Sequence, residues 1–236
     1  MNKQTVIITG ANRGLGLGLT RSFLEDGDRV IAICRKTSAE LQQAANENLE
    51  IIQCDLTDDT QLASLARQFR ERSIDVLINN AGMMAKTGSV AGEESVQGFG
   101  YFNRELWHRL FDINLFTAMS LAELLVDNIA KSGRGRIVTI SSMLGSMKMN
   151  TFGGIYAYRA SKAGVNAIMK SMSIDLADRG IIAIAQHPGW VKTDMGGSGA
   201  DIDIQTSVVG MKNVINGLTR ADSGKFLSWD GSELPW

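Results

Sequence analysis

The chain has 236 residues, of which 44% are hydrophobic and 21% charged, a composition typical of a globular protein rather than a disordered or fibrous one. Its formal net charge of -1 offers no attraction to nucleic acid or to an anionic membrane, so neither is expected as a partner. The two histidines, His108 and His187, have no companions at metal-ligand spacing, so no metal site is expected.

The first expected strand begins close to the N-terminus, at Thr5, with no charged region, apolar core or cleavage site of a secretory leader before it. No apolar run reaches the length of a membrane span. Cys34 and Cys54 each lie inside an apolar run, which favours buried free thiols in a reducing compartment over a disulfide. These features predict a cytoplasmic protein.

Short runs rich in β-branched residues alternate along the chain with longer segments of helical periodicity. The expected strands are Thr5–Gly10, Arg29–Cys34, Glu50–Asp55, Asp75–Asn79, Arg136–Ser141, Ile181–Gln186 and, more weakly, Lys225–Trp229. The expected helices are 14–26, 38–47, 58–72, 103–131, 155–179 and 205–219. Strands that are apolar throughout suit a parallel sheet covered on both faces. The pattern predicts a single doubly wound α/β domain of three layers, α/β/α, over residues 1–236.

The first expected strand ends in a glycine-rich turn that leads into a helix. Glycines at positions 10, 14 and 16 permit a tight turn and let backbone N–H groups approach a pyrophosphate at the helix N-terminus. Their spacing, G-x-x-x-G-x-G, differs from the G-x-G-x-x-G of the larger dehydrogenases. A plain strand-to-helix turn is the alternative. The position in the first strand, turn and helix of an alternating chain favours a dinucleotide site in a Rossmann-type sheet.

The segment TGANRGLG, residues 9–16, resembles the nucleotide loop of the short-chain dehydrogenase/reductase family. Further motifs occur in that family's order: Cys54-Asp55-Leu56, Asn79-Asn80-Ala81-Gly82, Asn114, Ser142, Tyr158-Arg159-Ala160-Ser161-Lys162 and Pro188-Gly189-Trp190-Val191-Lys192-Thr193. The resemblance covers essentially the whole chain. The segments NTFGGIYAYRASKAG, PGWVKTDMGG and FLSWDGSELPW are similar to the C-factor/sniffer-like carbonyl reductase branch.

The resemblance implies a nicotinamide cofactor site. Asp55 would hold the adenine amino group, although a helix cap is the alternative. The Asn80-Ala81-Gly82 turn would line the adenosine ribose, and Val191 and Thr193 would bond the carboxamide and a nearby phosphate. The expected cofactor residues are Gly10, Asn12, Arg13, Gly14, Leu15, Gly16, Arg35, Asp55, Leu56, Asn80, Ala81, Gly82, Tyr158, Lys162, Pro188, Gly189, Val191 and Thr193.

The segment after the second strand indicates which nicotinamide cofactor is used. An NAD enzyme of this fold places a carboxylate there to bond the ribose 2′-OH. Here the residues are Ile33-Cys34-Arg35-Lys36, with no carboxylate. Arg35 and Arg13 could instead converge on a 2′-phosphate through charge-assisted hydrogen bonds. The sequence therefore predicts NADP(H), with NAD(H) as the alternative.

Tyr158 and Lys162 are four residues apart on an expected helix, so their side chains share one face. The Lys162 ammonium is expected to lower the phenol pKa from about 10 toward the operating pH, which would make Tyr158 an acid-base group. Tyr156 is the alternative, but it has no lysine four residues on.

Ser142 is expected to polarise a substrate carbonyl, and the resemblance implies that Asn114 holds a water connecting Lys162 to solvent. Ser141 competes with Ser142 for this role. The family's serine lies three residues before a glycine, and Gly145 selects Ser142. Together these residues predict reduction of an aldehyde, ketone or quinone to an alcohol. A nucleotide-binding regulatory or signalling protein with little turnover is the alternative.

A small apolar carbonyl substrate is expected because several methionines follow strands four, five and six, where ligands of open α/β sheets bind. These are Met83, Met84, Met143, Met147, Met149 and Met195. Filling of core gaps is the alternative. The resemblance implies a homodimer or homotetramer, because the helices that hold Asn114 and Tyr158 commonly pair across a two-fold axis in this family. The Tyr158 helix carries small residues that allow close helix approach: Ala157, Ala160, Ala163, Gly164 and Ala167. Packing of these residues onto the sheet is the alternative.

Overall fold

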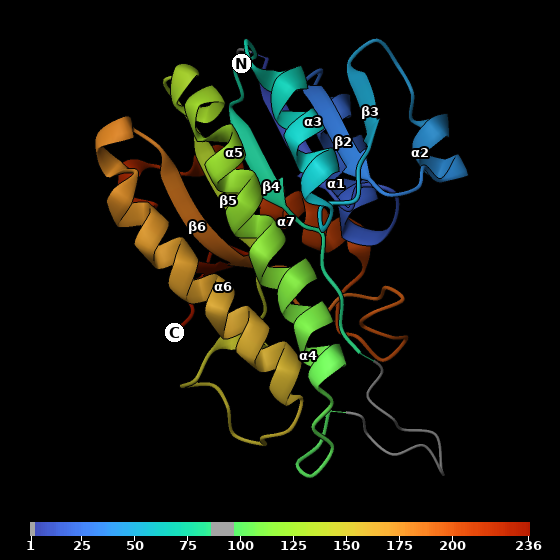
Figure 1. Ribbon diagram of the computed structural model, residues 1–236, viewed down its shortest axis with the longest axis vertical. Coiled ribbons are helices and arrows are strands. Elements are labelled where there is room, and N and C mark those ends of the chain that lie inside the picture. Colours follow the sequence, from blue (N-terminus) through green and yellow to red (C-terminus); the bar gives the residue numbers. More distant parts are fainter. Residues whose placement is uncertain (1–2, 86–96) are drawn as a thin grey trace.

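The computed structural model describes residues 3–85 and 97–236, and these contain one seven-stranded sheet (Figure 1). The strands are β1 (Thr5–Thr9), β2 (Arg29–Cys34), β3 (Leu49–Gln53), β4 (Val76–Asn79), β5 (Arg136–Ile140), β6 (Ile182–His187) and β7 (Phe226–Ser228). Their order is β3-β2-β1-β4-β5-β6-β7, and every neighbouring pair is parallel. The predicted doubly wound parallel sheet is confirmed, including the weak seventh strand.

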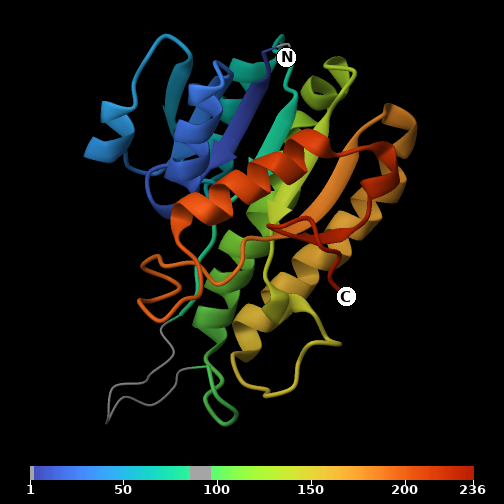
Figure 2. The ribbon, with the colours of Figure 1, turned by 180° about the vertical axis from the view of Figure 1, so that it is seen from behind.

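Helices cover both faces of this sheet. On the face turned to the viewer in Figure 1 lie α3 (Asp59–Phe69), α5 (Thr117–Lys131) and α6 (Tyr156–Asp175). The reverse view in Figure 2 shows α7 (Ile204–Gly217) and, beside it, α1 (Gly14–Glu25). The short α2 (Ala39–Gln43) follows β2, and α4 (Arg104–Phe111) continues the line of α5 beyond the sheet.

Strand residues alternate between two apolar cores because successive side chains point to opposite faces. Ile31 and Ile33 belong to the core under α3, α5 and α6. Val30 and Ala32 belong to the core under α1 and α7. All four are fully buried, which explains why β2 is apolar throughout.

The two cysteines follow the same alternation. Cys34 is in the core under α1 and α7, whereas Cys54 is in the core on the other face of the sheet. Both are buried free thiols, as predicted. The sheet separates them, so they cannot form a disulfide with each other.

The predicted helix 103–131 is continuous from Arg104 to Lys131, but its middle is irregular. Residues Asp112–Phe116 form a π-helical turn between α4 and α5. Such a turn adds one residue to the helix and interrupts the i to i−4 hydrogen bonding. Asn114 lies inside it.

The strand order reverses at β1, which lies between β2 and β4. In an open α/β sheet, ligands bind at the carboxyl ends of the strands at such a switch point. The turns that follow β1 and β4 meet there.

In the described part of the chain, no helix is both long and apolar enough to cross a membrane.

Candidate active site

The glycine-rich turn after β1 is packed tightly against the turn after β4. Gly10 has a φ of +64°, and a Cβ there would lie 3.0 Å from Cα of Ala81. A Cβ on Gly16 would lie 2.3 Å from the Gly10 carbonyl oxygen and 2.6 Å from Nδ2 of Asn80. Gly14 has a φ of +53°, in the left-handed region that favours glycine. The three glycines are therefore required by the backbone, and α1 begins at Gly14 with its N-terminal N–H groups beside this turn.

Asn80 connects these two turns by hydrogen bonds and does not point outward. Its Nδ2 donates to the Thr9 carbonyl at 2.8 Å, and its backbone N–H donates to Oγ1 of Thr9 at 3.0 Å. The Ala81 N–H also donates to Oγ1 of Thr9, at 2.9 Å. The Asn80 side chain is thus used to join β1 to β4, and a ligand at this turn would meet the Ala81-Gly82 segment rather than the Asn80 amide.

Asp55 is not a helix cap, because α3 is capped by Asp58. Oδ1 of Asp55 accepts from the N–H and the hydroxyl of Thr57, at 3.1 and 2.8 Å, which fixes the carboxylate at the exposed end of β3. The neighbouring Leu56 side chain packs into the core. Only the backbone of Leu56 therefore remains for a cofactor, whereas the contact of the Asp55 carboxylate with an adenine stays a prediction.

The two arginines expected to select NADP(H) are both exposed at the carboxyl ends of β1 and β2. Arg13 forms an ion pair with Asp194, at 2.9 Å between Nη1 and Oδ2. This pair joins the glycine-rich turn to the loop after β6. The Asn12 carbonyl on the same turn accepts from Oγ of Ser38 at 2.7 Å.

The segment 188–196 follows β6 and lies against the glycine-rich turn. A Cβ on Gly14 would meet Cγ2 of Thr193 at 3.8 Å. Gly189 has a φ of +85°, and the Pro188 carbonyl accepts from Oγ of Ser207 at 2.6 Å, which ties the turn to α7. Val191 is buried and bridges to Ile202. The cofactor residues predicted from three distant segments are therefore brought together at one edge of the sheet.

Tyr158 lies on the first turn of α6 and is 7% exposed. Its phenol lies beside the side chain of Ser142, which lies just after β5. Burial raises the pKa of Tyr158 to about 12, and the neighbouring Ser142 hydroxyl opposes this rise. At neutral pH the phenol is therefore protonated and able to donate.

The two neighbouring serines have different partners. Oγ of Ser141 donates to Oδ1 of Asn166 at 2.6 Å, inside the protein. Ser142 faces Tyr158, and its Oγ also accepts from the Leu144 N–H at 3.2 Å. Ser142 is the serine beside the phenol, as predicted.

Lys162 shares the helix face of Tyr158, but its ammonium does not act on the phenol as predicted. Nζ donates to the Ile140 carbonyl at 2.7 Å and lies 5.8 Å from the centre of the Tyr158 ring. Burial lowers the pKa of Lys162 to about 8. Burial of the phenol itself raises the pKa of Tyr158, whereas the sequence predicted that Lys162 would lower it.

Asn114 is 2% exposed and its side-chain amide is already engaged. Oδ1 accepts from the Met83 N–H at 2.7 Å, while Nδ2 donates to the Met83 carbonyl at 2.9 Å and to Oγ of Ser161 at 3.0 Å. A Cβ on Gly82 would lie 3.3 Å from Oδ1 of Asn114 and 3.7 Å from Nζ of Lys162. The π turn therefore places Asn114 next to Lys162, but the amide holds the segment after β4.

The apolar surroundings of Tyr158 come from two of the predicted methionines. Met83 and Met84 pack against the cluster of Leu110, Ala157 and Tyr158. Met147 is 78% exposed, and Met143 and Met195 are also exposed. Tyr156, the alternative acid, is 42% exposed and contacts the ring of Phe99 instead.

Three residues near this site, Arg159, Asp194 and Asn166, were missed by the sequence reasoning. Arg159 and Asp194 were visible inside the quoted motifs but had no assigned role. Asn166, which accepts from Ser141, lies four residues beyond Lys162 on the same helix face, and this spacing could have indicated it.

His187 accepts from the Met143 N–H through Nδ1 at 3.4 Å. Burial lowers the pKa of His187 to about 4, so it is neutral beside the Ser142 turn.

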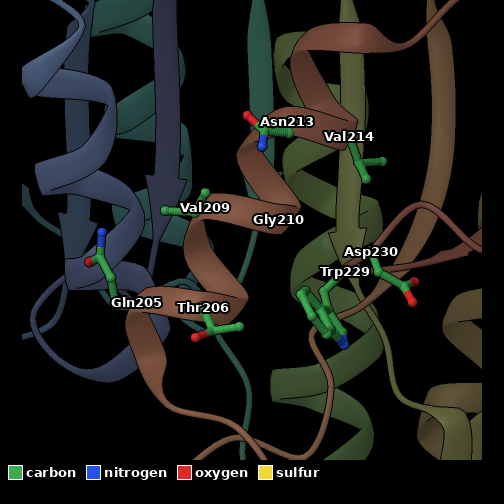
Figure 3. A pocket seen from close by; sticks show the side chains of 8 residues that line it. All are labelled: Gln205, Thr206, Val209, Gly210, Asn213, Val214, Trp229 and Asp230. Carbon is green, nitrogen blue, oxygen red and sulfur yellow. The ribbon is translucent and has the colours of Figure 1, made fainter.

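A hollow of about 540 Å³ lies elsewhere, on the outer side of α7 (Figure 3). Trp229 and Asp230 close it from the segment after β7. A Cβ on Gly210 would lie 2.5 Å from Cε3 of Trp229, so glycine lets the indole lie against α7. Because α7 and α6 cover opposite faces of the sheet, this hollow is separate from Tyr158.

Comparison with known proteins finds one matching family model and several similar proteins. The model of the short chain dehydrogenase family matches residues 4–201. C-signal of Myxococcus xanthus is 37% identical over 163 residues, which cover 69% of this chain and 93% of that protein. The carbonyl reductase Sniffer of D. melanogaster has a TM-score of 0.88 at 32% identity over 100% of both chains. NADPH-bound carbonyl reductase from chicken fatty liver has a TM-score of 0.85 at 30% identity, again over 100% of both chains.

Proposed function

The chain belongs to the short-chain dehydrogenase/reductase family, and from this premise we propose that it reduces the carbonyl group of a small apolar aldehyde, ketone or quinone to an alcohol, with NADP(H) as cofactor. The observation that carries the proposal is the burial of Ser142, Tyr158 and Lys162 together, with the Tyr158 phenol beside Ser142 where β5 ends. A protonated phenol beside a serine hydroxyl is suited to donate a proton to a developing alkoxide.

The edge of the sheet fits a dinucleotide. The glycine-rich turn has two residues at positive φ and opens onto the N-terminus of α1, where backbone N–H groups would hold the pyrophosphate. Asp55 would bond the adenine and the backbone of Ala81-Gly82 would border its ribose. Val191 and Thr193 would hold the nicotinamide end. When bound, the cofactor supplies hydride to the substrate carbon.

Two observations support NADP(H) over NAD(H). The described residues after β2 present Arg35 and Lys36 and no carboxylate for the ribose 2′-OH. Arg13 lies on the adjacent turn with 73% of its side chain exposed, so it can leave Asp194 for a phosphate. Two similar proteins, at 30% and 29% identity, are described as binding NADPH and NADP.

In the proposed reaction Ser142 and Tyr158 both bond the substrate carbonyl oxygen, which becomes negative as hydride arrives. Tyr158 then donates its proton to that oxygen. Lys162, whose pKa is about 8, would return a proton toward Tyr158 and also reach the nicotinamide ribose. The Asn114 amide is already bonded to Met83, so we assign the contact with a relay water to its backbone carbonyl in the π turn.

Met83, Met84, Leu110 and Leu144 give the apolar walls next to Tyr158, which supports a small apolar substrate. A homodimer or homotetramer remains a prediction, and two of the small residues behind it have partners inside the chain. Gly164 packs against Leu115, because a Cβ on this glycine would lie 3.0 Å from Cδ2 of that leucine, and Ala157 is 2% exposed. These small residues serve packing within the chain.

The second candidate is a nucleotide-binding signalling protein with little turnover. The 37% identity to C-signal is the observation that favours it. A binding module has no need of a buried Ser142, Tyr158 and Lys162 together, so we rank the enzyme first. Oxidation of NADPH, followed at its absorbance band with a panel of aldehydes, ketones and quinones, tests the proposal. Tight NADPH binding without turnover on any of them would favour the signalling candidate.

A further inference from the structure

Arg159, which follows Tyr158 on α6, is a buried arginine without an acidic partner in the described chain. It is 8% exposed, and no carboxylate in residues 3–85 or 97–236 forms an ion pair with it. Burial lowers its pKa. A buried guanidinium is costly unless its donors are used, so its contacts indicate what it does.

The guanidinium joins the two ends of the segment 143–155, which follows Ser142 and leads into α6. Nη1 donates to the Leu144 carbonyl at 3.3 Å, and Nε donates to the Gly154 carbonyl at 3.1 Å. The ring of Phe152 lies over the guanidinium, with its centre 4.5 Å from the Arg159 Cζ. Among residues 3–85 and 97–236, Nη2 is buried without a hydrogen-bond partner, and the three contacts above orient the group.

Both ends of this segment form walls around Tyr158. Leu144 and Ile155 pack against the cluster of Leu110, Ala157 and Tyr158. Arg159 bonds the carbonyl of Leu144 itself and the carbonyl directly before Ile155. The positions of two walls beside the phenol therefore depend on one guanidinium.

The second end is strained and needs such support. Gly153, Gly154 and Ile155 have φ values of +64°, +63° and +53°. A β-branched residue rarely adopts this left-handed conformation, and it persists only where its surroundings fix it. The bond from Arg159 to the Gly154 carbonyl fixes the peptide immediately before Ile155.

We propose that Arg159 is a positioning residue that sets substrate selectivity: it closes the segment 143–155 into a ring and so holds Leu144 and Ile155 against Tyr158. This rests on the proposed carbonyl reduction. Arg159 makes no contact with the reacting atoms. Loss of Arg159 should widen the substrate site. The binding of small substrates should then weaken more than that of extended ones, while proton donation from Tyr158 continues.

The test compares R159M, which keeps an apolar stem, with R159K and with K170M, an exposed position on the same helix that serves as control. Hydrogen exchange of peptides covering 143–155 should accelerate about tenfold in R159M, with no change in the glycine-rich turn. With benzaldehyde as substrate, KM should rise about tenfold and kcat change by less than about threefold. With 9,10-phenanthrenequinone, KM should change little. R159K, which retains a donor, should be intermediate.

The exchange measurement needs no turnover, so it tests the hold on the segment even if the wild-type protein reduces neither compound, an outcome that would reject the proposed function instead. If R159M does not fold, F152A removes the covering ring and should give the same changes in smaller measure. Unchanged exchange in 143–155 would overturn the proposal. So would equal losses in kcat for both substrates without a shift in KM.

Discussion

The side chain of Ser142, just after β5, lies beside the phenol of Tyr158 on the first turn of α6. The adjacent Ser141 points the other way, and its hydroxyl donates to Oδ1 of Asn166 at 2.6 Å. Two neighbouring serines therefore have different surroundings, one at the proposed reaction centre and one in the core. Substitution of Ser142 should therefore affect catalysis, and substitution of Ser141 should affect stability.

The variant S142A should lower kcat/KM by about a hundredfold or more, because a donor to the developing oxyanion is lost. NADPH affinity should be nearly unchanged. The variant S141A should instead lower the free energy of unfolding by about 1–3 kcal/mol, since it leaves Oδ1 of Asn166 buried without its donor. Steady-state kinetics and urea unfolding of both variants measure the two effects. A reversed pattern would assign the reaction to Ser141.

Lys162 should make stability depend on pH in a defined direction. Its pKa is about 8 in the folded protein and 10.5 as its ordinary value. Between these values the unfolded chain binds more protons, so stability rises with pH. The gain of wild type over K162M between pH 8 and 10 should be about 2 kcal/mol. Above about pH 10 the stability of the wild type itself should fall as the pH rises, because the pKa of Tyr158 is raised to about 12 in the folded state and the folded protein then binds more protons.

Urea unfolding of wild type and K162M at several pH values checks this prediction, with K170M as a control for loss of a lysine at an exposed position on the same helix. Parallel stability curves for wild type and K162M would mean that Lys162 is not desolvated in solution.

Removing the proposed 2′-phosphate ligands should change cofactor preference. R13A and R35A should each weaken NADPH binding by about tenfold or more, since each deletes a charge-assisted hydrogen bond, while NADH binding changes little. D194N is a useful control, because it removes the partner of Arg13 and leaves Arg13 itself. Dissociation constants from cofactor fluorescence measure this. Equal losses for NADPH and NADH would show that the arginines do not read the phosphate.

Much of this organisation could be predicted because it depends on local sequence. The strands of β2 and β6 are apolar on both faces, so alternation alone indicated a covered parallel sheet. The glycines at 10, 14 and 16 follow the first strand and permit a tight turn there, and the backbone requires glycine at all three positions. These signals need no knowledge of distant contacts, and the structure places the glycine turn, Tyr158 and Lys162 at one edge as expected.

What the sequence could not predict depends on partners far along the chain. The ammonium of Lys162 bonds the Ile140 carbonyl, and no spacing rule reveals that contact. The π turn at Asn114 adds a single residue, which a helical period over a long segment does not detect. Arg159 carries no signal of its own inside its motif, and only the folded segment 143–155 shows what it holds.

Of the methionines predicted to line the substrate site, some pack beside Tyr158 and others are exposed, so their substitution should have different effects. M84A should change the ranking of carbonyl substrates and their KM values, because Met84 packs in the Tyr158 cluster. The double variant M147A/M149A should have a smaller effect, since Met147 is 78% exposed. Kinetics on the same substrate panel compare them. A larger effect of the double variant would place the substrate beside the segment 143–155 instead.

The most direct test of the account is NADPH oxidation by wild type and Y158F with the best carbonyl substrate, together with NADPH binding by both. Wild type should turn over, and Y158F should lose turnover by about a thousandfold or more, because the ring stays and the proton is removed. Its NADPH dissociation constant should stay within about threefold, and Y156F should behave as wild type. Near-normal turnover in Y158F would contradict the assignment of Tyr158 as proton donor.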